Sequence, residues 1–154
     1  GITGLFLGYY YPWDGLTNAL ISQAYGFKTY KGSVEGSMVN YENLDNFQVG
    51  IHDYFKFLKF GFGRTTDIIC THIRRGRLTR QDGLEIVKRL DGVFPWEYLG
   101  KSLHEILKPL DIDIKEFIKI CDQFTNKKIF QREPSGSFVK DKNGRLTKIN
   151  YDNL

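Results

Sequence analysis

The side chains best suited to bind a ligand lie between Lys56 and Arg80. The run holds a Gly-aromatic-Gly turn, an Arg-Thr-Thr-Asp step and further arginines: Lys59, Gly61, Gly63, Arg64, Thr65, Thr66, Asp67, Arg74 and Arg77. Backbone amides at a helix start, beside guanidinium groups, bind phosphate or carboxylate. Glycines let the backbone approach such a ligand closely. The spacing therefore predicts an anion clamp, although a helix C-cap, a turn and an N-cap with solvated charges explain the same residues equally well.

The positive charge of the chain is concentrated in this region. Residues 56–90 contain nine basic and three acidic residues, a net charge of +6, whereas the whole 154-residue chain carries +4 and the remainder therefore −2. A local positive field favours a discrete anionic ligand over an extended polyanion. The glycine turn lacks the spacing and the terminal Lys-Ser/Thr of a Walker loop.

A second candidate site is the loop of residues 28–42, which is rich in Gly, Ser, Tyr and Lys. Glu35 and Tyr41 are of the types that hold a sugar through hydrogen bonds and ring stacking, although a plain turn is the commoner explanation. The three histidines lack metal-ligand spacing, and no Ser-His-Asp or Cys-His arrangement is visible. Cys70 and Cys121 are isolated, as expected for reduced thiols. No motif is complete enough to catalyse a reaction alone.

The elements that must position these residues are mostly helical. Leu5–Tyr10 reads as a short strand, and Asp14 caps a helix over residues 16–25. Apolar residues spaced by threes and fours predict a helix from Leu44 to Gly61. Thr65 or Thr66 is expected to cap the next helix. Capping boxes open three more, at Thr79-x-x-Asp82, Ser102-x-x-Glu105 and Asp113-x-x-Glu116.

The fold class predicted is therefore mainly α, with one short N-terminal strand and a C-terminal hairpin. Asn143-Gly144 would form a type I′ turn that pairs residues 138–141 with 146–149, and a loosely held terminus is the alternative. We divide the chain into a helical segment, 1–132, and a polar tail, 133–154. No apolar stretch approaches the ~20 residues of a membrane span, which favours a cytoplasmic protein.

Several stretches together resemble the C-terminal part of the bacterial N-acetyl sugar amidotransferase family. The resemblance covers roughly residues 5–125, and the order of its motifs is more specific than any one of them. They are Phe6-Leu7-Gly8-Tyr9-Tyr10-x-Pro12-Trp13-Asp14-Gly15, Glu35-Gly36-Ser37, Asn40-Tyr41-Glu42-Asn43, Gly50-Ile51-His52-Asp53-Tyr54, Leu58–Asp67 and Ile73–Arg80.

The resemblance implies membership of the PP-loop ATP pyrophosphatase superfamily and a role in lipopolysaccharide O-antigen or nonulosonic acid pathways. It implies ATP- and Mg²⁺-dependent activation of the acetamido oxygen of a free or nucleotide-linked sugar. Ammonia from a partner glutaminase then gives an acetamidino group. The family's Ser-Gly-Gly-x-Asp-Ser loop and its N-terminal cysteine cluster do not occur here. We therefore expect a segment of a longer polypeptide that normally packs on an α/β PP-loop domain, that alone holds no ATP or metal, and that is inactive alone.

What the resemblance carries over is the surface around Lys59, Gly61, Gly63, Arg64, Thr65 and Asp67, as a phosphate or sugar contact. On this view Arg64→Ala lowers the activity of the full-length enzyme and leaves the fold intact. A non-catalytic helical module that docks the N-terminal domain or a second copy as a homodimer is the alternative. Nucleic-acid binding through Arg74–Arg80 is the weakest reading, because the net charge is modest.

Overall fold

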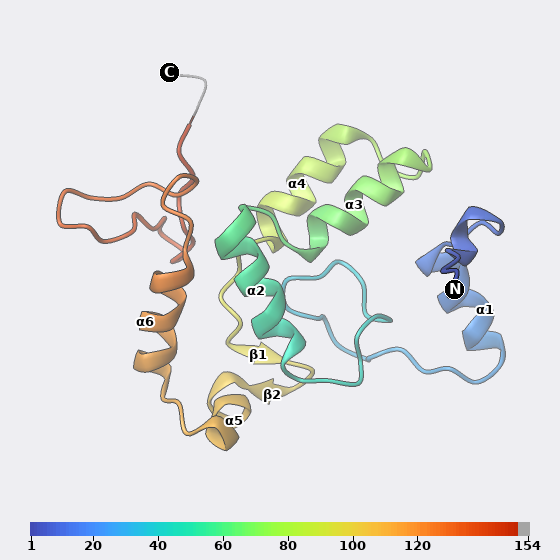
Figure 1. Cartoon of the computed structure of the whole chain (residues 1–154), viewed down its shortest axis with the longest axis horizontal. Coiled ribbons are helices and arrows are strands. Elements are labelled where there is room, and N and C mark those ends of the chain that lie inside the picture. Colours follow the sequence, from blue (N-terminus) through green and yellow to red (C-terminus); the bar gives the residue numbers. More distant parts are fainter. Residues whose placement is uncertain (151–154) are drawn as a thin grey trace.

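The computed structural model describes residues 1–150 and is mainly α-helical, as predicted (Figure 1). Strands β1 and β2, of two residues each, pair in antiparallel fashion and form the only regular sheet among the described residues. The elements are α1 (Gly15–Ala24), α2 (Val49–Phe60), α3 (Arg64–Arg74), α4 (Arg80–Leu90), β1 (Glu97–Tyr98), β2 (Lys101–Ser102), α5 (Leu103–Leu107) and α6 (Ile114–Phe124), with 3-10 turns at Leu7–Tyr9 and Lys108–Leu110.

The prediction of an N-terminal strand at Leu5–Tyr10 is wrong. Residues 5–10 have no strand partner among residues 1–150, and a lone strand leaves its backbone groups unpaired. They close a 3-10 turn instead, in which the amides of Tyr9 and Tyr10 donate to the carbonyls of Phe6 and Leu7, both at 3.0 Å. All of these side chains are exposed.

The predicted helix caps are confirmed at four of five starts. The side chains of Asp14, Thr79, Ser102 and Asp113 each accept a hydrogen bond from an amide of the first turn, and Ser102 with Glu105 forms the full reciprocal box. The expected cap of α3 is wrong, because that helix begins at Arg64 with Gly63 as its N-cap residue. The hydroxyls of the two threonines are engaged elsewhere, as described below.

Helix α2 begins at Val49 rather than at Leu44. The side chain of Asn46 accepts a hydrogen bond from the amide of Gln48 at 2.8 Å, a local turn that competes with helix formation. Gly50, which lowers intrinsic helix stability by roughly 1 kcal/mol relative to Ala, lies against the ring of Tyr98. A Cβ at that position would come within 2.8 Å of the ring, so the glycine permits the close packing of α2 on β1.

The main core lies between α2, α5, α6 and the segment that follows them. Its buried members are Tyr54, Phe57, Leu58, Leu103, Leu107, Phe117, Cys121, Phe130 and Leu146. Phe130 and Leu58 are fully buried. Leu146 belongs to this core, so the polar tail packs on the helices through an apolar side chain. The contacts among the described residues do not establish whether residues 133–154 form a separate unit, and that division stays a prediction.

The C-terminal hairpin is present, with a turn different from the one predicted. Lys140 and Leu146 form an antiparallel bridge, and the amide of Asp141 donates to the carbonyl of Arg145 at 2.8 Å. Residues 142–144 form the loop, in which Gly144 has φ +77° and Asn143 does not have a positive φ. A type I′ turn needs positive φ at both central residues, so this is a three-residue hairpin loop.

Helix α1 lies at the opposite side of the molecule from α6, beside the α3–α4 pair (Figure 1). Asp14, the N-cap residue of α1, forms ion pairs with Arg75 and Arg77, which lie in the turn between α3 and α4. Only Ala19 of α1 is buried. Residues of α1 line both clefts described next.

Candidate functional site

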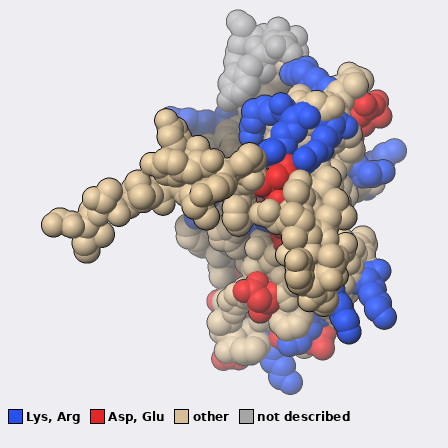
Figure 2. Space-filling view, turned by 90° about the vertical axis from the view of Figure 1, so that its right-hand side faces the viewer, with Lys and Arg blue, Asp and Glu red and all other residues tan. Residues whose placement is uncertain are grey.

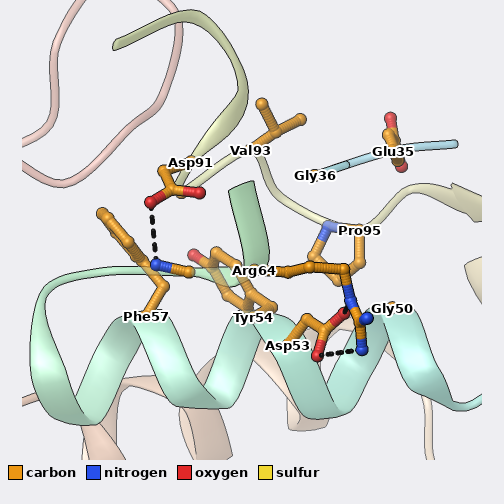
Figure 3. Close-up of a pocket in the computed structure, with 12 residues that line it drawn as sticks. Glu35, Gly36, Gly50, Asp53, Tyr54, Phe57, Arg64, Asp91, Val93 and Pro95 are labelled. Atoms are coloured by element: carbon orange, nitrogen blue, oxygen red, sulfur yellow. Dashed lines mark hydrogen bonds and ion pairs between the residues drawn. The ribbon is translucent and has the colours of Figure 1, made fainter. Parts of the chain in front are cut away.

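The guanidinium of Arg64, which the sequence places in an anion clamp, is held by carboxylates of the chain itself. Its Nε lies 2.6 Å from Oδ2 of Asp53 on α2, and its Nη1 lies 3.3 Å from Oε2 of Glu42. Figure 3 shows the guanidinium turned toward Asp53. Burial lowers the pKa of Arg64, but the hydrogen bond and the charge of Asp53, with the charge of Glu42, outweigh it and raise the pKa. The cation is therefore already neutralised.

The N-terminus of α3 is likewise occupied from within the chain. The amide of Gly63 donates to Oδ2 of Asp91 at 2.8 Å, and the hydroxyl of Thr66 donates to the same oxygen at 2.5 Å. Asp91 is buried. A helix N-terminus attracts an anion, and here a side-chain carboxylate supplies it. Residues 1–150 therefore do not fit the phosphates of ATP–Mg²⁺ at this turn.

A small cavity of about 20 Å³ lies beside this carboxylate, lined by residues that include Glu35, Asp53, Tyr54 and Arg64 (Figure 3). A volume of that size holds about one water molecule and excludes a sugar or nucleotide. Oε2 of Glu35 accepts a hydrogen bond from the amide of Glu97 at 2.9 Å. Burial raises the pKa of the Glu35 carboxyl. Glu35 thus holds β1 in place and does not reach a larger cleft.

A larger cleft of about 200 Å³ lies between the start of α1, the 41–42 segment and α3, and we call it the Trp13 cleft. It brings together three of the predicted site residues, Tyr41, Asp67 and Arg77. Trp13, Glu42 and His72 also line it, with apolar contributions from Leu16 and Ile68. Trp13 is 68% exposed, so most of its surface is accessible to a ligand.

A second cleft of about 370 Å³ adjoins the first and shares four of its lining residues: Trp13, Gly15, Tyr41 and Glu42. Its other walls are uncharged and include Asn18, Ser22 and Phe27. The two hollows therefore form one groove around Tyr41 and Trp13. Small-molecule sites generally occupy roughly 300–1,000 Å³, with aromatic walls and a few polar groups. The groove has that composition.

Ion pairs fix the charged walls of the Trp13 cleft. Oδ2 of Asp14 lies 2.8 Å from Arg77 and 3.0 Å from Arg75, and Lys56 pairs with Asp67. The hydrogen bond from Arg77 and that from the amide of Thr17 hold the pKa of Asp14 well below its ordinary value. Burial, together with the charges of Glu42 and Asp14, raises the pKa of Tyr41, so its hydroxyl stays protonated at neutral pH.

The remaining predicted residues do not reach the groove. The ammonium of Lys59 lies 5.0 Å from the ring centre of Phe124 on α6. Gly61 ends α2 with φ +76°. Thr65 is fully buried, and its hydroxyl donates to the carbonyl of Gly36 at 2.8 Å. Arg74 bonds the hydroxyl of Thr71 at 3.3 Å on the outer surface.

Sequence reasoning missed four residues that shape the site: Trp13, Glu42, Asp53 and Asp91. Trp13 lies in a quoted motif but 54 residues before Asp67, so no local spacing joins them. Each carboxylate has an ordinary surface context in the sequence, and only the fold brings it to a cation or to a helix start. Within residues 1–150, no three His, Cys, Asp or Glu side chains gather as a metal site requires.

Comparison with known protein families adds an identification. Residues 35–142 match the family described as "LPS biosynthesis protein WbpG-like, C-terminal domain". This range is more than half of the chain. The chain belongs to this family. No curated protein matches it. The match confirms the resemblance at the level of a C-terminal portion of a lipopolysaccharide biosynthesis protein.

The WbpG-like domain supplies half of the residues that line the groove. Tyr41, Asp67 and Arg77 lie within the matched range, whereas Trp13 and α1 precede it. The groove is therefore formed where the family domain meets the segment before it. Binding sites commonly lie at such junctions. Among residues 1–150, no helix combines the length and apolar character that crossing a membrane requires.

Proposed function

We propose that the chain is the substrate-contacting C-terminal segment of an ATP-dependent sugar amidotransferase in lipopolysaccharide biosynthesis. The full enzyme would convert the N-acetyl group of a free or nucleotide-linked sugar to an acetamidino group. Membership of the WbpG-like family supports the pathway. The resemblance to N-acetyl sugar amidotransferases supports the reaction, and the polar, aromatic groove supports the substrate class.

The proposed chemistry needs parts outside this sequence. The acetamido oxygen attacks the α-phosphorus of ATP, pyrophosphate leaves, and the oxygen carries an adenylyl group. Ammonia from a glutaminase subunit then adds to the amide carbon, and AMP departs with that oxygen. An N-terminal PP-loop domain would hold ATP–Mg²⁺, since the helix start best suited to phosphate here is filled by Asp91. The enzyme would work in the cytoplasm, where ATP is available.

The observation that carries the proposal is the meeting of Tyr41, Asp67 and Arg77 with Trp13 in one cleft. Aromatic faces cover the apolar side of a sugar ring, while carboxylates accept and a guanidinium donates hydrogen bonds at its rim. These types were predicted on two separate segments of the sequence. Their convergence is a property of the fold.

The test uses the full-length enzyme with its ammonia source and a Tyr41→Ala variant. Loss of the ring should lower kcat/KM for the sugar at least tenfold, which corresponds to about 1.4 kcal/mol. The matched control is Tyr25→Ala, because Tyr25 is 89% exposed at the end of α1 and lines neither cleft. Equal activity of both variants would remove this segment from the substrate site.

A second candidate function, docking of another domain or a second copy, is favoured by the N-terminal surface. Residues 1–13 carry no charged side chain. Figure 2 shows one projection of the molecule that contains no Lys, Arg, Asp or Glu. Large apolar side chains are exposed there and on α1: Ile2, Leu5, Phe6, Leu7, Tyr9, Tyr10, Tyr11, Leu20 and Ile21. Extended exposed apolar patches mark interaction sites.

Light scattering distinguishes the two candidates. A docking module that self-associates should form a dimer that dissociates when residues 1–11 are removed, with the groove residues irrelevant to it. A monomer that does not bind a hydrophobic dye would exclude this second function, while sugar binding would still be measurable.

A further inference from the structure

We infer that the Trp13 cleft holds the uncharged ring of an N-acetylated sugar and that the diphosphate of a nucleotide sugar binds elsewhere. The inference rests on the proposed function and specifies which part of the substrate this site recognises. It replaces, for Asp67 and Arg77, the expectation of an anion clamp that rested on the glycine turn, the helix start and the local positive charge.

The walls of the cleft carry more negative than positive charge. Asp14, Glu42 and Asp67 line it, against the single guanidinium of Arg77. That guanidinium is already committed to Asp14 at 2.8 Å. A diphosphate placed here would face three carboxylates within one small hollow, and like charges at such separations repel. The site is therefore unsuited to an anion.

The cations behind these walls bring the local charge to zero without leaving a positive group available. Arg75 pairs with Asp14, Arg64 pairs with Glu42 and Asp53, and Lys56 pairs with Asp67. The cleft and its ion-pair partners thus comprise four carboxylates and four cations. Paired groups of this kind keep their remaining lone pairs and N–H groups for neutral hydroxyls.

A sugar ring uses each of these features. Carboxylate oxygens of Asp67 and Glu42 accept from ring hydroxyls, and a hydrogen bond to a charged acceptor is about twice as strong as a neutral one. The exposed face of Trp13 covers the C–H face of the ring. Leu16 and Ile68 offer apolar contact for an acetyl methyl group.

Trp13 also provides the measurement. The chain has two tryptophans, and Trp96 lies outside both clefts, packed on Phe94 with ring centres 4.6 Å apart. In a Trp96→Phe background, fluorescence reports Trp13 alone. The probes are N-acetylglucosamine, N-acetylgalactosamine, N-acetylmannosamine, UDP-N-acetylglucosamine, UDP-N-acetylgalactosamine and UDP, each at low and high salt.

We expect at least one free N-acetylhexosamine to quench or shift Trp13. For N-acetylglucosamine and N-acetylgalactosamine, the affinity of the free sugar and that of its UDP-linked form should agree within about threefold. This corresponds to a difference in binding free energy of less than about 1 kcal/mol. Excess UDP should not compete, and salt should have little effect, because the ring is neutral. Binding of UDP alone, or a UDP-sugar more than tenfold tighter than its free sugar, would overturn the inference. So would the absence of binding by every free sugar.

A variant that removes one negative charge from the cleft should change the affinity in opposite directions, depending on whether the cleft binds a neutral sugar ring or a diphosphate. Asp67→Asn removes one negative charge and a strong hydroxyl acceptor, so it should weaken sugar binding about tenfold. If the cleft received a diphosphate, the same change would tighten UDP-sugar binding. Asp122→Asn on α6, outside both clefts, is the matched control and should leave the affinity unchanged.

The outcomes for the proposed function are separate. Free-sugar binding together with a full-length enzyme that forms no acetamidino product would reject the amidotransferase and keep the ring site. Product formation combined with competition by UDP would keep the amidotransferase and reject the ring assignment.

Discussion

Replacement of Arg64 by Ala should lower the free energy of unfolding of the domain rather than remove a ligand contact. Its guanidinium bonds both oxygens of Asp53, at 2.6 and 3.4 Å, and it also reaches Glu42. The side chains of Arg64 and Asp53 are 21% and 14% exposed. Deletion of the cation leaves the Asp53 carboxylate largely buried without its partner, so the cost falls on the folded state.

The size of the effect follows from the degree of burial. Removing one partner of a fully buried pair costs about 3–5 kcal/mol, and an exposed pair contributes only about 0–1 kcal/mol. A pair that is about four-fifths buried lies between these limits, so we expect a loss of about 2 kcal/mol. In a domain of this length the melting temperature should fall by about 4–8 °C.

The assay is urea unfolding followed by circular dichroism, with the free energy extrapolated to water. Arg74→Ala is the control, since Arg74 is exposed and makes one side-chain bond, and its effect should stay within about 0.5 kcal/mol. In an Asp53→Asn background the Arg64→Ala cost should shrink, because the buried charge is gone. An Arg64→Ala protein as stable as wild type, but inactive in the full enzyme, would refute this reasoning and restore the clamp.

Three further perturbations test other parts of the fold. Asp91→Asn should cost about 1–2 kcal/mol of unfolding free energy, because the Gly63 amide loses a charged acceptor; an unchanged urea midpoint would contradict this. The pKa of Asp14 is lowered in the folded state, so its stabilising contribution is fully present above its unfolded pKa of about 4 and is lost progressively as the pH falls from that value through the lower pKa of the folded state. Trp13 fluorescence should therefore change on acidification, and Asp14→Asn should abolish that change. Ser102→Ala should cost about 1 kcal/mol through the lost cap of α5, and thermal melting that matches wild type would argue against the box.

Local patterns predicted the helices well because their causes are local. A cap such as Ser102 with Glu105 needs only four consecutive residues, and the apolar spacing of α6 reads directly from the sequence. The hairpin turn was located for the same reason. The Leu5–Tyr10 strand failed because a strand requires a partner elsewhere in the chain, and its residues find none among 1–150.

Three of the residues predicted from the sequence line the candidate cleft, but the sequence did not predict that they would lie together. Tyr41, Asp67 and Arg77 do meet, but Lys59 lies on the α6 side and Thr65 is buried under Gly36. The residues that line the cleft and those that do not lie on different faces and elements around α3. Asp67 is on the face that α1 approaches, whereas Lys59 belongs to the end of α2. Sequence distance does not specify which of these faces another segment covers.

The charge of the region shows most clearly why a sequence with many arginines need not bind an anion. Residues 56–90 carry a net charge of +6 in the sequence, yet Arg64, Arg75 and Arg77 each meet a carboxylate from outside that window. Asp14 lies more than 60 residues before the two arginines that it contacts, and Asp53 lies just before the window, so a count over residues 56–90 includes neither. The arginines hold Asp14, Asp53 and Glu42 in place. Of these, Asp14 and Glu42 line the Trp13 cleft, where we propose that a sugar ring binds. A positive window therefore predicts anion binding only where no carboxylate from another segment reaches it.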